Sequence, residues 1–195
     1  MRRPPLRLLI LAAAALLGAA ACEAQPSTRG CGRHGAVISE AAAARPLPGL
    51  TGRVVDMADL LPAPAEQRIT GELEALEAAT TDQLVVVTVP ELDGEPIESL
   101  GLRLGLGWGI GQESVDNGVL LIVAPRDRHA RIEVGCGLEG LLTDERAQQI
   151  MDDELIPRFA DGEFEQGIDA GVTAIAAVLR SDRRRPQPWQ EKETS

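Results

Sequence analysis

Aromatic residues are nearly missing from this chain: tyrosine is absent, and tryptophan and phenylalanine contribute two residues each among 195. A core must therefore be built from leucine, valine, isoleucine and alanine, which together with the other apolar residues make up 44% of the chain. So few rings also argue against an aromatic platform that stacks single-stranded nucleic acid. The length suits one domain with tails rather than two domains.

Positive charge is scarce as well, with 19 Lys and Arg against 30 Asp and Glu and a formal net charge of -11. Phosphate backbones are bound by clustered Lys and Arg, so the charge argues against nucleic acid as a partner. Cations or basic partners fit this charge better.

Long apolar runs are missing too, and the longest one lies at the N-terminus. Residues 1–21 have a basic start, a short apolar stretch and small residues before Cys22, which is the pattern of an export signal. Cys22 resembles the lipidated cysteine of bacterial lipoproteins, although Ala19 stands where leucine is usual. Two alternatives stay open: lipidation of Cys22, or secretion after cleavage near Ala21 or Ala24. Either one places the mature protein outside the cytoplasm, and removal of residues 1–21 with their three arginines changes the charge to -14.

Only three cysteines and two histidines occur, and no Cys-x-x-Cys pattern indicates zinc or redox chemistry. If Cys22 is lipidated, Cys31 and Cys136 remain as an even pair, and an exported protein can keep a disulfide between them. The alternative is a free Cys136 thiol, with Cys31 paired to Cys22 or unpaired.

Behind the signal, composition divides the rest of the chain into a flexible tether over 22–49, a domain over 50–180 and a disordered tail over 181–195 that lacks a membrane helix. The predicted elements of the domain are a brief edge strand ending at Asp56, a helix over 65–79, a buried strand over 84–89, a helix from about Pro96 that the glycines between 105 and 111 end, a buried strand over 118–124, a half-exposed strand over 130–135, a helix from Thr143 that Pro157 closes, and a last helix over 163–179. The third and fourth strands are expected to form an antiparallel hairpin. The consistent architecture is a layered α/β fold with a small mixed sheet covered by helices on both faces.

Several acidic residues lie where these elements begin or end. Asp116 and Asn117 precede one strand and Glu139 follows its hairpin partner, so these three should meet at one end of the sheet. Asp56 and Asp144 are the other candidates, and such oxygen ligands without His or Cys suit Ca²⁺ or Mg²⁺. The alternative is structural, because Asp116-Asn117-Gly118 is also a good turn sequence and Thr143-Asp144 a good helix start.

An ordered set of short segments resembles the TPM-domain family. These segments are Gly52-Arg53-Val54-Val55-Asp56, Leu84 to Val89, Trp108-Gly109-Ile110-Gly111, Asp116-Asn117-Gly118-Val119-Leu120-Leu121, Arg131-Ile132-Glu133-Val134-Gly135, Gly137-Leu138-Glu139-Gly140, Thr143-Asp144 and Ile156-Pro157. The family includes thylakoid-lumen proteins of photosystem II repair and many bacterial envelope proteins. The resemblance covers about residues 50–179.

The resemblance implies a three-layer α/β/α sandwich, a divalent-cation site that is usually described as a calcium site, and a weak acid phosphatase activity. Transferred position by position, it makes Asp56, Asp116, Asn117, Glu139 and Asp144 the metal candidates, and Arg131 a candidate for phosphate binding.

We therefore expect an exported, lipid-anchored TPM-domain protein of the cell envelope, periplasmic or otherwise extracytoplasmic. It would be held at the membrane through Cys22, bind Ca²⁺ (or Mg²⁺) and serve as an interaction or maintenance module for an unidentified envelope protein. The alternative is a weak metal-dependent phosphatase in which Asp116 or Glu139 holds the metal or the attacking water.

Overall fold

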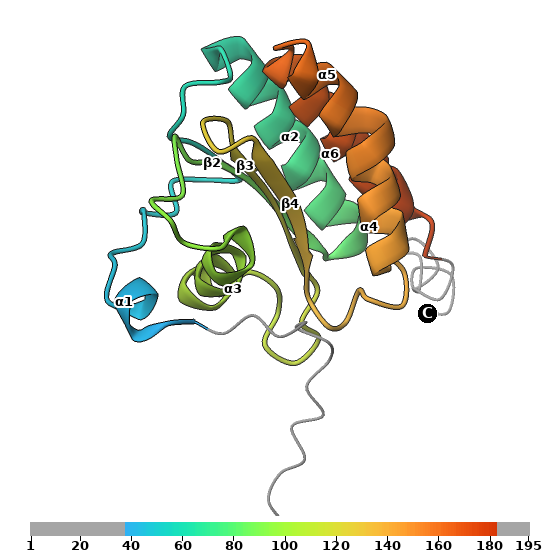
Figure 1. Ribbon diagram of the computed structural model, residues 1–195. Coiled ribbons are helices and arrows are strands. Elements are labelled where there is room, and N and C mark those ends of the chain that lie inside the picture. The colour runs from blue at the N-terminus through green and yellow to red at the C-terminus, as the bar shows by residue number, and fades with distance from the viewer. Residues whose placement is uncertain (1–37, 183–195) are drawn as a thin grey trace, which may run out of the picture. The chain divides into compact units, whose positions relative to one another are not determined.

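The structure is a computed structural model that describes residues 38–182 (Figure 1). The predicted signal, Cys22, Cys31 and the tail from residue 183 lie outside the described residues. Four strands form one sheet in the order β1-β2-β3-β4. β1, β2 and β3 are parallel, and β4 runs antiparallel to β3. The mixed sheet and the β3–β4 hairpin predicted from the sequence are thus confirmed.

The elements and their bounds are α1 (Glu40–Ala43), β1 (Val54–Asp56), α2 (Ala63–Thr80), β2 (Gln83–Thr88), α3 (Ile97–Trp108), β3 (Gly118–Ala124), β4 (His129–Val134), α4 (Asp144–Ile150), the π-helical turn η1 (Met151–Leu155), α5 (Ile156–Ala160) and α6 (Phe164–Arg180). Every predicted strand and long helix of the domain has a counterpart among them.

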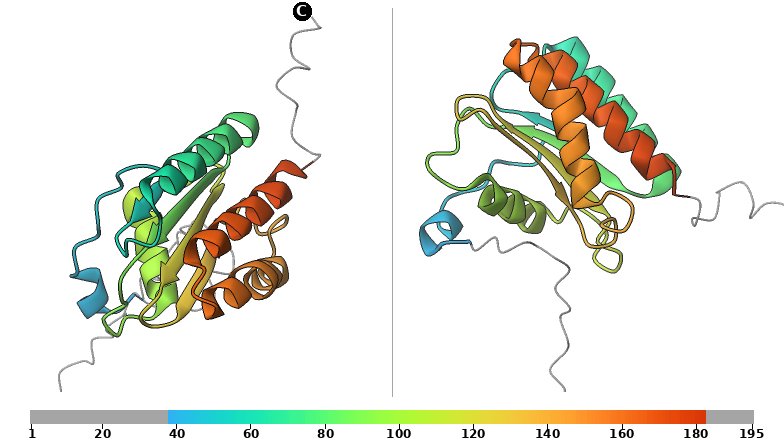
Figure 2. Two further views of the ribbon diagram at one scale, coloured as in Figure 1. Left: turned by 90° about the horizontal axis from the view of Figure 1, so that it is seen from above. Right: turned by 45° about the vertical axis from the view of Figure 1, so that its right-hand side comes forward.

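Two apolar layers separate the sheet from its helices. On one face, Val86, Leu121 and Ile132 pack with α2, α6 and the α4–α5 region. On the other face, the alternate residues Val85 and Ile122 pack with α3. Figure 2 shows α2 and α6 side by side across one face of the sheet and α3 on the opposite face. β2 and β3 lie between the two layers, which explains their continuous β-branched and leucine sequence.

The glycines after residue 104 do not all end α3 as expected. Gly105 and Gly107 lie inside the helix, which continues to Trp108 and ends at Gly109 in the left-handed conformation (φ 62°). There is little room beside Gly107, where a Cβ would overlap the side chain of Leu47, whereas a Cβ at Gly105 would make an ordinary contact with Leu120.

Pro157 was expected to close the helix that begins at Thr143, and this was wrong. The helix instead widens into η1 and continues as α5 to Ala160. In η1 the backbone N–H of Ile156 donates to the carbonyl of Met151, one residue further back than in an α-helix. Pro157 then occupies the first turn of α5, where a proline nitrogen needs no hydrogen-bond acceptor.

Residues 38–49, the described part of the predicted tether, contact the domain. The indole N–H of Trp108 donates to the Pro48 carbonyl (2.8 Å), and Arg103 donates to the Arg45 carbonyl (2.9 Å). Arg103 also forms a buried bidentate pair with Glu95, at 2.9 and 3.1 Å. Among the described residues, no helix has the length and apolar character needed to span a bilayer.

Candidate functional site

Asp116 lies in the loop before β3, at the end of the sheet where the three parallel strands begin. Its backbone is left-handed (φ 52°), and its N–H donates to the Gln112 carbonyl at 2.6 Å. Its carboxylate accepts the N–H of Cys136 (3.2 Å) and its carbonyl accepts the N–H of Gly137 (3.0 Å). The second Gly-rich turn therefore fixes both oxygen-bearing groups of Asp116. A Cβ at Gly135 would overlap the Asp116 carbonyl oxygen, so this approach requires the glycine.

Asn117 is 1% exposed and serves as a structural connector. Its amide oxygen accepts the Gln112 N–H (2.9 Å), and its amide nitrogen donates to the Thr81 carbonyl (2.7 Å) and to Asp82 (3.3 Å). The first bond lies within the loop before β3, and the other two join this loop to the end of α2. Because both amide hydrogens and the oxygen are engaged, the turn interpretation of Asn117 is favoured over a metal ligand.

A groove of about 460 Å³ runs beside Asp116, between α3 and the hairpin. Three carboxylates line it: Glu113, Asp116 and Glu133. Glu133 accepts a hydrogen bond from Arg131 Nε at 2.7 Å, so part of its charge is compensated. The groove is the place in the described residues where Asp116 meets other acids.

Asp56 lies at the other end of the sheet. It is paired with Thr88, and Thr88 with Val123, whereas the Asp116 loop adjoins the pair Gln83–Gly118. Five residues of strand separate these positions, which is about 16 Å. The Asp56 carboxylate accepts the N–H groups of Leu60 (3.2 Å) and Leu61 (2.8 Å), so it closes the turn after β1. The structure therefore does not bring Asp56 and Asp116 together.

The two remaining metal candidates, Glu139 and Asp144, lie in different surroundings. Glu139 is half-buried after the second Gly-rich turn and does not line the groove beside Asp116. Asp144 is exposed in the first turn of α4, which Thr143 caps by accepting the N–H of Arg146 (3.3 Å). Across residues 38–182, no three His, Cys, Asp or Glu side chains are grouped as a ready metal site.

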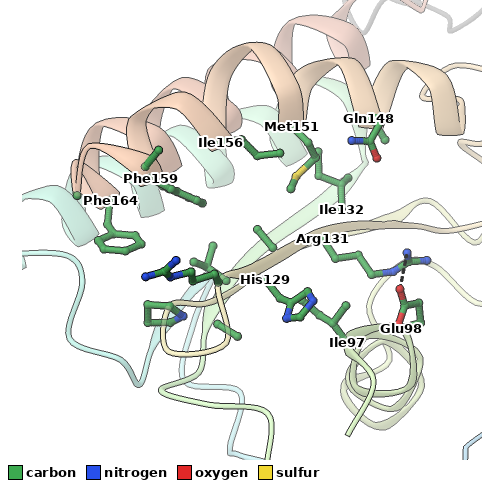
Figure 3. A pocket seen from close by; sticks show the side chains of 18 of the residues that line it. Ile97, Glu98, His129, Arg131, Ile132, Gln148, Met151, Ile156, Phe159 and Phe164 are labelled. Atoms are coloured by element: carbon green, nitrogen blue, oxygen red, sulfur yellow. Dashed lines mark ion pairs between the residues drawn. The ribbon is translucent and has the colours of Figure 1, made fainter. Parts of the chain in front are cut away.

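A larger cavity, of about 870 Å³, lies along β4 on the outer side of the hairpin. Figure 3 shows Met151, Ile156 and Phe159 on its helical wall, opposite β4 and the start of α3. Arg131 and Asp144 both line this cavity. Arg131 is paired with Glu133 and also lies 3.8 Å from Glu98. The phosphate candidate and one metal candidate thus share a cavity that Asp116 does not line.

Sequence reasoning missed the apolar wall of this cavity. Ile156 is 47% exposed and lies directly after the π-helical turn η1. The spacing of the apolar residues does not predict this turn. Such π-helical turns often occur at functional sites. The only available signal was Ile156-Pro157 itself, a proline within a continuing helical pattern. His129 is exposed and lines the same cavity.

Cys136 is disulfide-bonded. The other two cysteines, Cys22 and Cys31, lie outside the described residues, so the pairing with Cys31 stays a prediction.

Comparison with known proteins identifies the family of this domain. The model of the TPM domain matches residues 54–178, from the first residue of β1 almost to the end of α6. The chain belongs to the TPM-domain family. No curated protein matches this TPM-domain chain at a significant level.

Solved structures match the TPM-domain chain as well. The N-terminal domain of a protein from P. gingivalis is 36% identical, with a TM-score of 0.64 over 69% of this chain and 86% of that one. The BA42 protein of the psychrophilic bacterium Bizionia argentinensis is 20% identical, with a TM-score of 0.55 over 63% and 83%. The N-terminal domain of the cg2496 protein of Corynebacterium glutamicum is 15% identical, with a TM-score of 0.54 over 71% and 87%. The last two show the fold alone, and together the comparisons confirm the α/β sandwich.

Proposed function

We propose that this TPM-domain protein is an exported, lipid-anchored module of the cell envelope that acts by binding rather than by catalysis. It binds a divalent cation, Ca²⁺ in preference to Mg²⁺, at the end of the sheet that carries Asp116, and it engages an envelope protein. The observation that carries the cation proposal is the fixed Asp116 carboxylate at a groove shared with Glu113 and Glu133.

Oxygen chemistry supports a hard cation at this end of the sheet. Ca²⁺ accepts carboxylates, backbone carbonyls and water in flexible geometry, so it does not need three grouped acidic side chains. Asp116 supplies a held carboxylate, and the neighbouring Glu113 and Glu133 raise the local negative charge. With so few protein carboxylates the affinity should be weak, about 0.1–1 mM, as in extracellular calcium modules.

The described residues also favour binding over catalysis. His129 is their single histidine, and its side chain has no hydrogen bond or ion pair with another described residue. Ser99 donates to Glu95 (3.0 Å) inside the buried pair with Arg103 rather than to a base in a cavity. Neither side chain has the nucleophile–base geometry of covalent catalysis.

Isothermal titration calorimetry with CaCl₂ and MgCl₂ tests the cation proposal. The full chain should give saturable heat with Ca²⁺, and Asp116→Asn should lose it because the substitution removes the held charge. Glu74→Gln changes an exposed acid on α2 and should bind like the wild type. Absence of heat with both cations would contradict the proposal.

Export and anchoring rest on the N-terminal sequence and are tested separately. A Cys22→Ala variant should move from the membrane fraction to the soluble fraction after cell lysis, because the acylated residue is gone. A variant that stays with the membrane would contradict anchoring at Cys22 and leave the cation proposal untouched.

A weak phosphatase is the second candidate, and the shared cavity of Arg131 and Asp144 is the observation in its favour. Arg131 is already held by Glu133 and lies near Glu98, which reduces its availability for a phosphate. Hydrolysis of p-nitrophenyl phosphate that requires a divalent cation and disappears in Arg131→Ala would favour the enzyme. No cation-dependent hydrolysis above background would leave binding as the function.

A further inference from the structure

β4 is an edge strand, paired with β3 on one side. The N–H of Gly135 donates to the Gly118 carbonyl (2.7 Å), which identifies this pair as a hydrogen-bonded one. Hydrogen-bonded pairs alternate along an antiparallel ladder, so residues 129, 131 and 133 bond to β3. The N–H and C=O groups of Ala130, Ile132 and Val134 therefore point outward. This edge offers main-chain donors and acceptors to another strand.

The larger cavity follows the same edge. Residues 128–132 form one of its walls in an unbroken run, and α4, η1 and α5 form the other wall. Figure 3 shows the helical wall above β4 and the start of α3 below it. A strand added at this edge would place alternate side chains toward Met151 and Ile156 on one side and toward Ile97 on the other.

The exposure of Ile156 indicates an apolar contact on the helical side. Its side chain is 47% exposed, whereas the neighbouring cavity residues Met151 and Ile132 are each 7% exposed. A bound apolar side chain would cover Ile156 without disturbing the packing of the other two. Met151 and Ile132 are thus already packed without a ligand, whereas Ile156, at the rim of the cavity, is not.

The charge around the helical wall selects a basic occupant. Asp144 lines the cavity, and Glu145, Asp152 and Asp153 continue from it along the outer surface of α4 and η1. Arg131, on the opposite wall, is compensated by Glu133 and Glu98. Arg128, in the β3–β4 turn, also lines the cavity, so the selection for basic side chains comes from the side of the cavity that carries Asp144. The whole chain carries a net charge of -11, which disfavours a second copy of itself as the occupant.

We propose that the β4 edge and its cavity bind an extended basic segment of a partner protein, which adds to the sheet as a strand beside β4. The main chain of the segment bonds to residues 130, 132 and 134. Its apolar side chains, at alternate positions, lie against Ile156, and its basic side chains lie near Asp144. This site is separate from the cation proposal, so either can fail alone.

The probe is an acetylated and amidated decapeptide of alternating valine and lysine, titrated into the ¹⁵N-labelled full chain and followed by amide NMR shifts. The shifts should concentrate at Ala130, Ile132 and Val134. The counterpart with glutamate in place of lysine should bind about tenfold more weakly or not at all, because its charges meet Asp144 and its acidic neighbours. A version methylated at every amide nitrogen should not bind, because it cannot donate to the edge.

Two variants locate the site. Ile156→Gln should weaken binding by about tenfold through loss of apolar contact, and its control is Leu106→Gln, an exposed leucine (57%) on α3 outside this cavity. Ala130→Pro removes an outward donor while it keeps the ladder bonds to β3. If Ala130→Pro does not fold, Ile156→Gln and its control still test the location of the site.

Several results would overturn the proposal. They are absence of binding at millimolar peptide, equal binding of the methylated or acidic peptides, and binding that Ile156→Gln leaves unchanged. Sedimentation that shows a dimer which Ala130→Pro dissociates would assign the edge to a second copy. In the absence of peptide, amide chemical shifts at residues 128–134 that differ between the full chain and a chain without residues 183–195 would assign the β4 edge to the chain's own C-terminal segment.

Discussion

The Gly-rich end of β4 and the outer edge of the same strand border regions with opposite organisation. At the Gly-rich end, Asn117 has three side-chain hydrogen bonds and Asp116 is held by the N–H groups of Cys136 and Gly137. Along the outer edge of β4, the backbone groups point outward and Ile156 is half exposed beside a cavity of about 870 Å³. In the first region, these polar groups bond to other groups of the protein. In the second region, backbone hydrogen-bonding groups and apolar surface are exposed.

This difference separates a region whose hydrogen bonds hold loops in place, including the Asp116 carboxylate of the proposed cation site, from an edge whose groups are available to a peptide. A buried polar side chain with all its bonds made stabilises a loop, and its removal costs folding free energy. An exposed apolar side chain on a cavity rim contributes little to stability, so its removal should affect binding alone. The predictions below test that division.

The largest effect is expected for Asn117→Ala. The substitution removes three hydrogen bonds of a side chain that is 1% exposed, and it leaves the Gln112 N–H and the Thr81 carbonyl without this partner. The free energy of unfolding should fall by about 2–3 kcal/mol. Urea denaturation measures it, with the exposed Gln112→Ala as the control. A loss below about 0.5 kcal/mol would show that the loop does not depend on this residue.

The next effect is expected for Gly135→Ala. The added methyl group would overlap the Asp116 carbonyl oxygen, so the two Gly-rich loops must separate, at a cost of about 1–3 kcal/mol. Gly140→Ala is the matched control, because a Cβ there meets no atom within 4 Å. Thermal unfolding compares the two variants. Equal stability of both would contradict the close approach of the loops.

A small effect on stability is expected for Ile156→Gln. The side chain is half exposed, so the free energy of unfolding should change by less than about 0.5 kcal/mol. The same urea experiment measures this change. A loss of 2 kcal/mol or more (about the scale of core truncation) would make Ile156 part of the core and remove the contrast with the Gly-rich end.

The smallest effect concerns Glu145, at the start of α4. Its own backbone N–H and then the Thr143 hydroxyl hydrogen-bond its carboxylate and lower its pKa. A lowered folded-state pKa stabilises the protein above the ordinary carboxyl pKa, and this contribution is lost as pH falls through the folded value. The stability difference between wild type and Glu145→Gln should therefore shrink on acidification. A pH series of thermal melts tests it, and a difference that grows toward acid pH would contradict it.

Much of the fold follows from the sequence, because periodicity reports burial. The continuous apolar run of β3 predicts a strand covered on both faces, and Thr143 predicts the start of α4. The continuation of the helix past Pro157 could not be predicted in this way. It depends on the change of the backbone hydrogen-bond pattern in η1, which the pattern of apolar residues does not record.

The candidate site was harder to predict, because acids at strand ends have two possible roles. The expectation that Asp116 lies near the turn after β4 followed from hairpin geometry, and the contact with Cys136 agrees with it. Asp56 was included although a parallel strand places its carboxyl end about 16 Å from the Asp116 loop. The sequence could not show this separation, because the direction and order of β1 in the sheet were not known.

An NMR titration of the ¹⁵N-labelled full chain with Ca²⁺, followed by the alternating valine–lysine peptide, tests the division into two binding regions most directly. Ca²⁺ should shift the amides of Gly111, Asp116 and Gly137, and the peptide should then shift those of Ala130, Ile132 and Ile156. Shifts from both ligands at one set of residues, or no shift from either, would contradict the account.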